Sequence, residues 1–308
     1  MDQQSKKRVV LAGGSGFIGL KLAEHLSELG FDVVILSRNK PTEGPWSFCQ
    51  WDGRTLGDWA RVVDGAHAVV NLAGRSVDCV KTPLHIDQVL RSRVESTRVL
   101  GDAVHSAETK PAVWVQMSIA SIHGDSELEC DETSAYGYGF APTIGVEWEK
   151  AFAEKCPNDV RQVVLRISFV LGNTGVALKK LRFITKLGLG GTISTGRQGM
   201  SWIHEDDMIR IIERAITNES MNGAYIASSP NPLSNRDFMR QLRKTYRMPI
   251  GLPAAGWMIR FAARFILRTD AELALYGRYC IPQRLIDEGY EFAFGELDDA
   301  LSDLRRKQ

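Results

Sequence analysis

The chain has 308 residues, of which 44% are hydrophobic and 24% charged, and its formal net charge is +1. This composition is close to the average of globular proteins, so it excludes a disordered chain, a collagen-like repeat and a small disulfide scaffold. The low net charge excludes the strong basic field that is typical of nucleic-acid binders. The length suits one large α/β domain with a smaller appended lobe, and an enzyme is the expected class of protein.

Several features indicate a cytoplasmic protein. The five cysteines are scattered and form no C-x-x-C pair, which suits a reducing compartment and favours neither a zinc site nor disulfides. The basic segment Lys6–Arg8 precedes an apolar run, as in a signal peptide, but glycine interrupts that run after Ala12, so a buried first strand is favoured. No stretch has the ~18 uncharged apolar residues of a membrane span, and no membrane partner is expected.

The first half of the chain alternates short apolar strands with amphipathic helices. We expect strands over residues 8–12, 32–36, 67–73, 112–117 and 162–167, and helices over residues 17–29, 56–63, 83–107 and 143–155. Strict alternation of this kind predicts parallel βαβ units with right-handed crossovers. The predicted fold class is therefore α/β, a doubly wound parallel (Rossmann) sheet.

The second half changes character. A helix over 176–187 leads into a glycine-rich turn, and one more strand is expected over 223–227. After Pro230 the pattern indicates short helices broken by prolines, without a strand rhythm. We therefore predict a Rossmann domain over 1–172, with 195–229 returning to it, and a small, helix-rich, substrate-side domain over 230–308.

The strongest local motif is the glycine turn GGSGFIG between the first strand and the first helix. Gly13 allows a tight turn, Gly16 lets the backbone approach a pyrophosphate, and Gly19 allows the helix to pack against the strand. The free N–H groups at the start of the helix, at Phe17 and Ile18, would then face the phosphates. A glycine turn alone is weak evidence, but the complete strand–turn–helix context predicts a dinucleotide-binding site.

The residues that end the second strand indicate which dinucleotide binds. NAD binders carry an acidic residue there for the ribose 2′-hydroxyl, whereas Asp32 opens this strand and lies at the wrong end. Ser37 and Arg38 follow instead, and a hydroxyl and a guanidinium suit a 2′-phosphate. A solvated loop arginine is the alternative. NADP(H) is favoured over NAD(H).

The third strand ends at the same edge of the sheet with the small-residue segment Asn71–Gly74, where the backbone can pass close to the cofactor, and Ser76 follows as a possible polar contact. Together with the glycine turn, this segment resembles the short-chain dehydrogenase/reductase superfamily in its extended, sugar-nucleotide-epimerase-like branch. Further matches indicate an atypical family of epimerase-like NADP-binding proteins whose substrates are largely unknown. The matching stretches are Leu36–Arg38, Gln50–Asp52, Arg91–Arg93 with Thr97, Glu147–Glu149, Ser201–His204, Pro230–Pro232 and Ile281–Arg284.

The resemblance covers nearly the whole chain, including the C-terminal domain, and implies roles for individual residues. It implies that Ser37 and Arg38 hold the 2′-phosphate and that Ser168 lies near the nicotinamide. The residues implied to line or approach the rest of the cofactor are Leu72, Ala73, Gly74, Ser76, Gln88 and Arg93. From the sequence alone, Arg93 would be an ordinary helix-surface arginine, and Trp202 and His204 are expected to fix the lobes together rather than to perform chemistry.

The catalytic pair that the resemblance implies is absent. Working members of the superfamily use a tyrosine as acid/base with a lysine four residues later on one helix face. None of the seven tyrosines has a lysine at that spacing, and an apolar Ile119 stands near the usual catalytic hydroxyl. The weak remaining candidates are Ser118 and His123. His123 titrates near neutrality and stands where a second tyrosine would be, although a surface histidine is an equally open interpretation.

Two functions therefore compete. The first is an NADP(H)-dependent oxidoreductase or epimerase that acts on an unidentified small-molecule carbonyl or alcohol, with a nucleotide-sugar-like compound as one option, through an unconventional acid/base group. The second is a non-catalytic NADP(H)-binding sensor or scaffold. The intact lobe and cleft favour the enzyme, whereas the loss of the pair favours the scaffold. The sequence leaves the substrate, the direction of hydride transfer and the oligomeric state open, and it indicates no metal site.

The segment 256–268 carries Arg260, Arg264 and Arg268 at helical spacing. Three interpretations remain: a solvated or lobe-packing face, which is favoured, a site for an anionic substrate, and a helix on a membrane surface.

Overall fold

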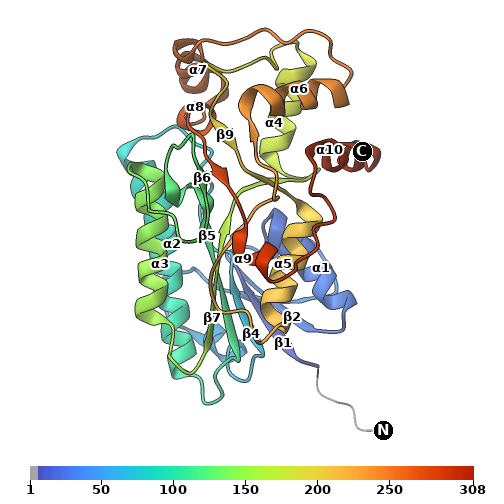
Figure 1. Ribbon diagram of the computed structural model, residues 1–308. Coiled ribbons are helices and arrows are strands. Elements are labelled where there is room, and N and C mark those ends of the chain that lie inside the picture. Colours follow the sequence, from blue (N-terminus) through green and yellow to red (C-terminus); the bar gives the residue numbers. More distant parts are fainter. Residues whose placement is uncertain (1–5) are drawn as a thin grey trace.

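A seven-stranded, entirely parallel sheet forms the centre of the molecule in the computed structural model, which describes residues 6–308 (Figure 1). The strand order is β11-β7-β5-β4-β1-β2-β3. These strands are β1 (Arg8–Ala12), β2 (Asp32–Ser37), β3 (Ser47–Gln50), β4 (Ala68–Asn71), β5 (Val113–Ile119), β7 (Arg161–Ile167) and β11 (Gly223–Ala227). Their near-continuous apolar sequences suit a sheet that is covered on both faces.

Two pairs of helices cover the sheet. α2 (Pro83–Ser106) and α3 (Phe140–Lys155) pack together on one face, and α1 (Phe17–Glu28) packs with α5 (Glu205–Thr217) on the other (Figure 1). Each face has its own apolar core, one containing Leu22, Leu26 and Ile212 and the other Leu100 and Phe152. The carboxyl ends of the strands are thus left as the free edge where α/β proteins bind ligands.

The C-terminal part is a smaller helical unit above that edge (Figure 1). Its own core joins Leu178 and Trp202 to Phe238, Leu301 and Leu304. The helices are α4 (Val176–Lys186), α6 (Asn235–Thr245), α7 (Gly256–Ala262) with the π-helical turn η3 (Ala263–Leu267), α8 (Glu272–Leu275) and α10 (Leu297–Arg306). The helix α9 (Gln283–Asp287) lies instead against β11, and its Leu285 belongs to the core on the α1 and α5 face of the sheet. Short strand pairs link this unit to the rest: β8 (Phe169–Leu171) with β10 (Trp202–His204), β9 (Gly199–Met200) with β12 (Leu233–Ser234), and β6 (Glu129–Cys130) with β13 (Tyr279–Cys280).

The predicted fold class is confirmed, with differences in individual elements. The sheet gains an edge strand, β3, which the sequence did not reveal because its residues are mostly polar or half-exposed. The helix expected over 56–63 is only a 3-10 turn, η1 (Asp58–Val62). The strand β11 lies in the main sheet beside β7. By contrast, α4 shares its core with α6 and α10 and so belongs with the C-terminal unit.

Candidate functional site at the carboxyl edge of the sheet

The glycine turn brings β1, α1 and the loop after β4 into close backbone contact. Gly13 has φ +77°, and a Cβ at this position would lie 2.6 Å from the Cα of Ala73. A Cβ on Gly19 would lie 2.4 Å from the backbone of Gly14, so α1 can approach the turn only with glycine there. These are the packing demands that a dinucleotide-binding turn imposes on its first and last glycines.

Gly16 is different, because a Cβ there would meet nothing within 4 Å. It caps α1 without any side-chain hydrogen bond, so the N–H groups of Phe17 and Ile18 in the first turn have no helical acceptor. The ring of Phe17 turns away and packs against Gly172 and Gly175. The start of α1 therefore offers open space, free N–H groups and the positive end of the helix dipole, which together suit a phosphate.

An exposed arginine, Arg38, directly follows the carboxyl end of β2. Ser37 is buried and its hydroxyl donates to the carbonyl of Asn39, whereas Arg38 is exposed. Among the described residues, no carboxylate pairs with Arg38. Asp32 lies at the opposite end of the strand, where its carboxylate is 3.2 Å from the Nε of Arg8. Asp32 is thus paired with Arg8 at the far end of the strand and is not placed to bind the ribose 2′-hydroxyl of NAD(H).

A buried asparagine holds the loop that follows β4. The side-chain amide of Asn71 donates to Thr97 Oγ1 and Gln116 Oε1, both at 3.0 Å, and its oxygen accepts from the N–H of Ala73 at 3.1 Å. These contacts fix Leu72 and Ala73 beside the glycine turn. Ser76 lies further along, exposed, and its hydroxyl accepts from the N–H of Asp78.

Arg93 is buried, so its interpretation as an ordinary surface arginine was wrong. Its guanidinium donates to the carbonyls of Arg75 and Val89 and lies 4.9 Å from the ring of Trp148, and a Cβ on Gly74 would lie 3.1 Å from its Cζ. Burial lowers the pKa of Arg93 to about 10. Its Nε has no partner among the described residues. Gln88, one turn earlier, accepts a hydrogen bond from Arg75. Both residues therefore lie against the loop after β4.

A buried ion pair lies beneath the ends of β5 and β7. Ser118 and Arg166 are register partners, and Glu149 on α3 connects them. The Ser118 hydroxyl donates to Glu149 Oε1 at 2.6 Å, and Arg166 donates to both carboxylate oxygens at 2.9 Å. Burial by itself lowers the pKa of Arg166, but the hydrogen bonds and charge of Glu149 outweigh burial and raise that pKa above its usual value. Ser118 is 1% exposed, so it serves this network rather than the open edge.

The same arginine also binds a tyrosine, Tyr136, which has no lysine four residues later in the sequence. The second terminal nitrogen of Arg166 donates to the hydroxyl oxygen of Tyr136 at 2.8 Å. A guanidinium can only donate, so the phenol accepts here and keeps its own proton for another acceptor. Tyr136 is 48% exposed. Only the fold reveals this pair, because the cation lies 30 residues further along the chain rather than four.

His123 is buried beside that tyrosine. Its ring centroid lies 6.3 Å from that of Tyr136, its Nδ1 is 3.2 Å from the carbonyl of Ala135, and its Nε2 has no partner among the described residues. Burial lowers the pKa of His123, so the imidazole stays neutral to a lower pH than in water. The interpretation as a surface histidine was wrong.

Three further residues have structural contacts. The hydroxyl of Ser168 donates to the carbonyl of Ala227 at 3.0 Å, just past β7. Trp202 is fully buried and its indole donates to the carbonyl of Asn231. His204 caps α5 and stacks on Phe294, with ring centroids 3.8 Å apart. The last two residues therefore join the parts of the chain, as expected.

His204 also lies near the carboxylates of Asp206 and Asp303, the donor types of a metal centre. The ammonium of Lys307 already bridges these two carboxylates at 3.0 and 2.8 Å. A lysine thus supplies the positive charge that a metal ion would bring.

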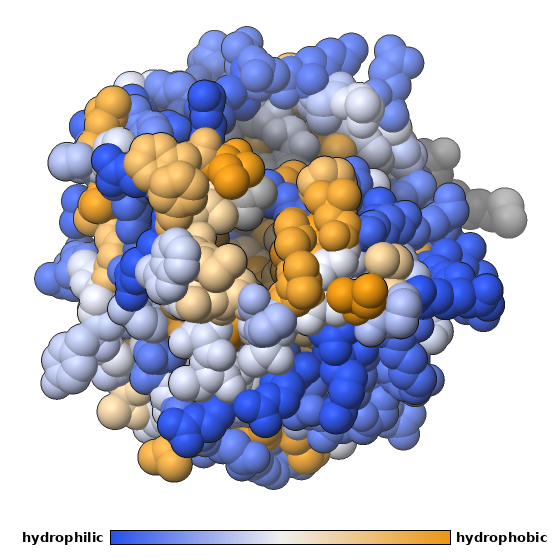
Figure 2. Space-filling model, turned by 90° about the horizontal axis from the view of Figure 1, so that it is seen from above, coloured by the Kyte–Doolittle hydropathy of each residue, from blue (hydrophilic) through white to orange (hydrophobic). Residues whose placement is uncertain are grey.

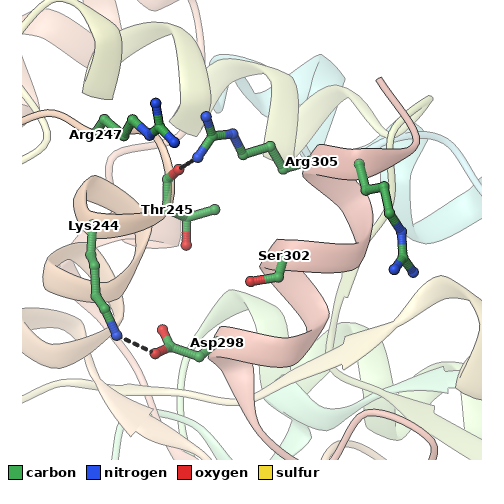
Figure 3. A pocket seen from close by; sticks show the side chains of 7 residues that line it. Lys244, Thr245, Arg247, Asp298, Ser302 and Arg305 are labelled. Carbon is green, nitrogen blue, oxygen red and sulfur yellow. Dashed lines mark hydrogen bonds and ion pairs between the residues drawn. The ribbon is translucent and has the colours of Figure 1, made fainter.

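A cavity of about 460 Å³ lies between α6 and α10, away from the residues discussed above (Figure 3). Figure 3 shows Arg247 and Arg305 facing one another across it, and Lys244 paired with Asp298 at 2.7 Å. None of the residues predicted to bind the cofactor lines this cavity. No helix among residues 6–308 is long and apolar enough to cross a membrane.

Comparison with known proteins agrees with the geometry. The NAD dependent epimerase/dehydratase family matches residues 9–226, and a domain of unknown function, DUF1731, matches residues 259–304. The chain therefore belongs to the NAD dependent epimerase/dehydratase family, as its motifs predicted.

Individual relatives are similar over nearly their full length. The human epimerase family protein SDR39U1 is 33% identical, over 96% of this chain and 99% of the relative. A chloroplastic SDR39U1 homolog from Arabidopsis thaliana is 31% identical, over 97% and 87%. A crystal structure of human SDR39U1 with NADPH superposes with a TM-score of 0.87 at 28% identity, covering 98% of this chain and 100% of that one. NADPH is also the cofactor that the end of β2 predicts.

Proposed function

We propose that this protein is an NADP(H)-dependent oxidoreductase or epimerase of the extended short-chain type, acting on a small carbonyl or secondary alcohol. The observation that carries the proposal is the pairing of Tyr136 with Arg166 at the edge where the cofactor turn opens. In this pair the tyrosine is a proton donor and the arginine is a fixed cation beside it. The superfamily uses its tyrosine and lysine for the same two purposes.

The residues at the edge fit NADP(H). The N–H groups of Phe17 and Ile18 would bind the pyrophosphate, and Arg38 would bind the 2′-phosphate. Leu72, Ala73 and Gly74 would line the ribose, with Arg93 and Gln88 behind them. Ser168 lies two strands further along the edge, on the side proposed for the nicotinamide. When bound, the cofactor supplies the hydride chemistry.

Tyr136 is the proposed acid/base residue. It would donate its hydroxyl proton to the oxygen of the substrate, and Arg166 would stabilise the phenolate that remains. Glu149 is a positioning residue, because it fixes both arms of the guanidinium from α3. Ser118 only orients that carboxylate.

A second candidate is a non-catalytic NADP(H)-binding sensor or scaffold. The observation that favours it is the burial of Ser118 and His123, the two polar groups closest to the usual catalytic positions, which are 1% and 4% exposed. NADPH binding without turnover of any aldehyde or ketone in a broad panel would favour this candidate.

The test is a calorimetric titration of the wild type and of Arg38→Asp with NADPH and with NADH. A charge-assisted hydrogen bond contributes about 1.5–3 kcal/mol, so the wild type should prefer NADPH by about tenfold to a hundredfold and the variant should lose that preference. Arg61→Asp is the matched control, because that arginine is exposed on η1. Failure of cofactor-free wild type to bind either nucleotide would overturn the proposal.

We also propose a cytoplasmic location. All five cysteines are free thiols, and three of them are buried. Such an arrangement suits a reducing compartment.

A further inference from the structure

One end of the molecule carries a row of exposed aromatic side chains beside a row of arginines. Trp257, Phe261 and Phe265 recur every four residues along α7 and η3, and they are 73%, 57% and 62% exposed. The arginines of the segment follow each of them by three positions, at Arg260, Arg264 and Arg268, and are exposed as well.

The segment faces the protein with Ile259, Ala262 and Ala263 and not with its aromatic side chains. Ala263 is buried and its neighbours Ile259 and Ala262 are half-buried, while α7 itself has no buried residue. A helix that packs on a core turns its large apolar residues inward. Here the orientation is reversed, because the large apolar residues face outward; the three exposed arginines suit the solvated-face interpretation rather than the lobe-packing one.

The exposed apolar surface continues onto the loops beside α7 and α4. Backbone hydrogen bonds from Leu252 to Gly188 and from Ala254 to Thr192 hold the two loops together. The further exposed apolar residues there are Phe183, Leu187, Leu189, Ile250 and Leu252. Figure 2 looks onto this end and shows apolar side chains gathered around a hollow. Monomeric proteins rarely leave so extended an apolar patch without a binding partner.

The charged residues of these segments are almost all basic. The chain has 38 lysines and arginines and 37 acidic residues, yet no acidic residue occurs between Asp159 and Glu205 or between Asp237 and Asp270. In the described part of the chain, no carboxylate pairs with Arg260, Arg264 or Arg268, whereas the neighbouring Lys81 and Lys180 have carboxylate partners. Lys179 and Lys186 on α4 are exposed too. A partner for this end must therefore be anionic as well as apolar.

We propose that this end of the molecule docks onto an anionic phospholipid membrane. Aromatic side chains insert at the boundary between headgroups and acyl chains, and arginines beside them bind the headgroup phosphates. The 12 residues of α7 and η3 would lie in the plane of the interface and not cross it. This inference concerns a surface apart from the cofactor turn and does not depend on the proposed oxidoreductase activity.

The test is sedimentation of the full chain with vesicles of phosphatidylcholine, with or without phosphatidylglycerol. Strong binding is expected only to vesicles that contain phosphatidylglycerol, and added salt should weaken it. Each cation near an anionic surface strengthens binding about fivefold, so Arg260→Gln, Arg264→Gln and Arg268→Gln together should weaken it about a hundredfold. Trp257→Ser, Phe261→Ser and Phe265→Ser together should weaken it by more than tenfold.

A charge-matched control replaces Arg61, Arg98 and Lys110 with glutamine, which removes the same net charge elsewhere. The proposal is overturned if this control loses as much binding as the arginine variant, or if the wild type binds neither kind of vesicle. Two other outcomes would also overturn it. Binding of monomeric dihexanoyl-phosphatidylglycerol one-to-one, without binding to vesicles, would indicate a site for a single lipid molecule. A wild-type dimer that becomes a monomer in the aromatic variant, as measured by sedimentation velocity, would indicate an interface between two copies of the chain. Thermal unfolding and far-UV circular dichroism of each variant show whether it is still folded. Together with the salt titration of the wild type, they separate loss of membrane binding from loss of the fold.

Discussion

The two halves of the carboxyl edge are built by different means. At β1 and β4 the backbone forms most of the proposed cofactor site, and the important residues are those that lack side chains or present N–H groups, such as Gly13 and Gly16. The end of β2 adds one exposed side chain, that of Arg38. At β5 and β7 the edge depends on a buried ion pair, Glu149 with Arg166, that supports Tyr136. The first half requires backbone segments to approach one another closely, whereas the second requires a buried ion pair.

The buried pair should be the most sensitive part of the edge. Glu149→Ala leaves the guanidinium of Arg166 buried and unpaired, which should lower the free energy of unfolding by about 3–5 kcal/mol. Denaturant titration measures this change. Replacing both partners with apolar residues, Glu149→Leu with Arg166→Met, should recover much of the loss, and a double variant less stable than Glu149→Ala would contradict the argument.

Tyr136→Phe should remove activity without removing the cofactor. Loss of a general acid typically costs at least a hundredfold in rate. Single-turnover oxidation of NADPH, with the aldehyde or ketone that the wild type reduces fastest, measures the loss. NADPH affinity should stay within about twofold, because the hydroxyl is held by Arg166 on β7, three strands along the edge from β1 and its glycine turn. Tyr138→Phe is the matched control, since that tyrosine is almost fully exposed. An unchanged rate in Tyr136→Phe would assign the proton transfer to another group.

A pair of glycine substitutions tests the backbone half. Gly13→Ala places a Cβ against Ala73 in a left-handed conformation, so the free energy of unfolding should fall by about 2 kcal/mol. Gly16→Ala has open space at φ −84° and should leave stability almost unchanged. If the pyrophosphate passes over Gly16, the same alanine should weaken NADPH binding more than tenfold in calorimetry. Equal effects of the two substitutions on stability would contradict the assigned roles.

The smallest effect concerns pH. Because burial lowers the pKa of His123, the unfolded chain binds a proton below about pH 6.5 before the folded chain does. Stability should therefore decrease as the pH falls below that value, and His123→Gln should flatten this part of the profile. Thermal unfolding from pH 7 downward measures it. If the stability profile of the variant has the same slope as that of the wild type, a group other than His123 causes the pH dependence. His204 is the next group to test, because burial lowers its pKa as well.

The sequence by itself determined the Rossmann architecture, the glycine turn and the position of Arg38. Each depends on local rules: apolar runs form buried strands, and only glycine fits where backbones touch. It also showed that the usual tyrosine and lysine pair is missing, because that pair has a fixed spacing on one helix.

Only the tertiary structure decided the rest. Arg166 reaches Glu149 and Tyr136 across 17 and 30 residues, and Arg93 reaches Arg75 across 18, so neither partnership has a local signature. The outward orientation of Trp257 and Phe261 was equally hidden, since an amphipathic pattern does not tell which face meets the core. Burial and long-range pairing depend on where distant segments pack, which is a property of the folded chain and not of any short stretch of it.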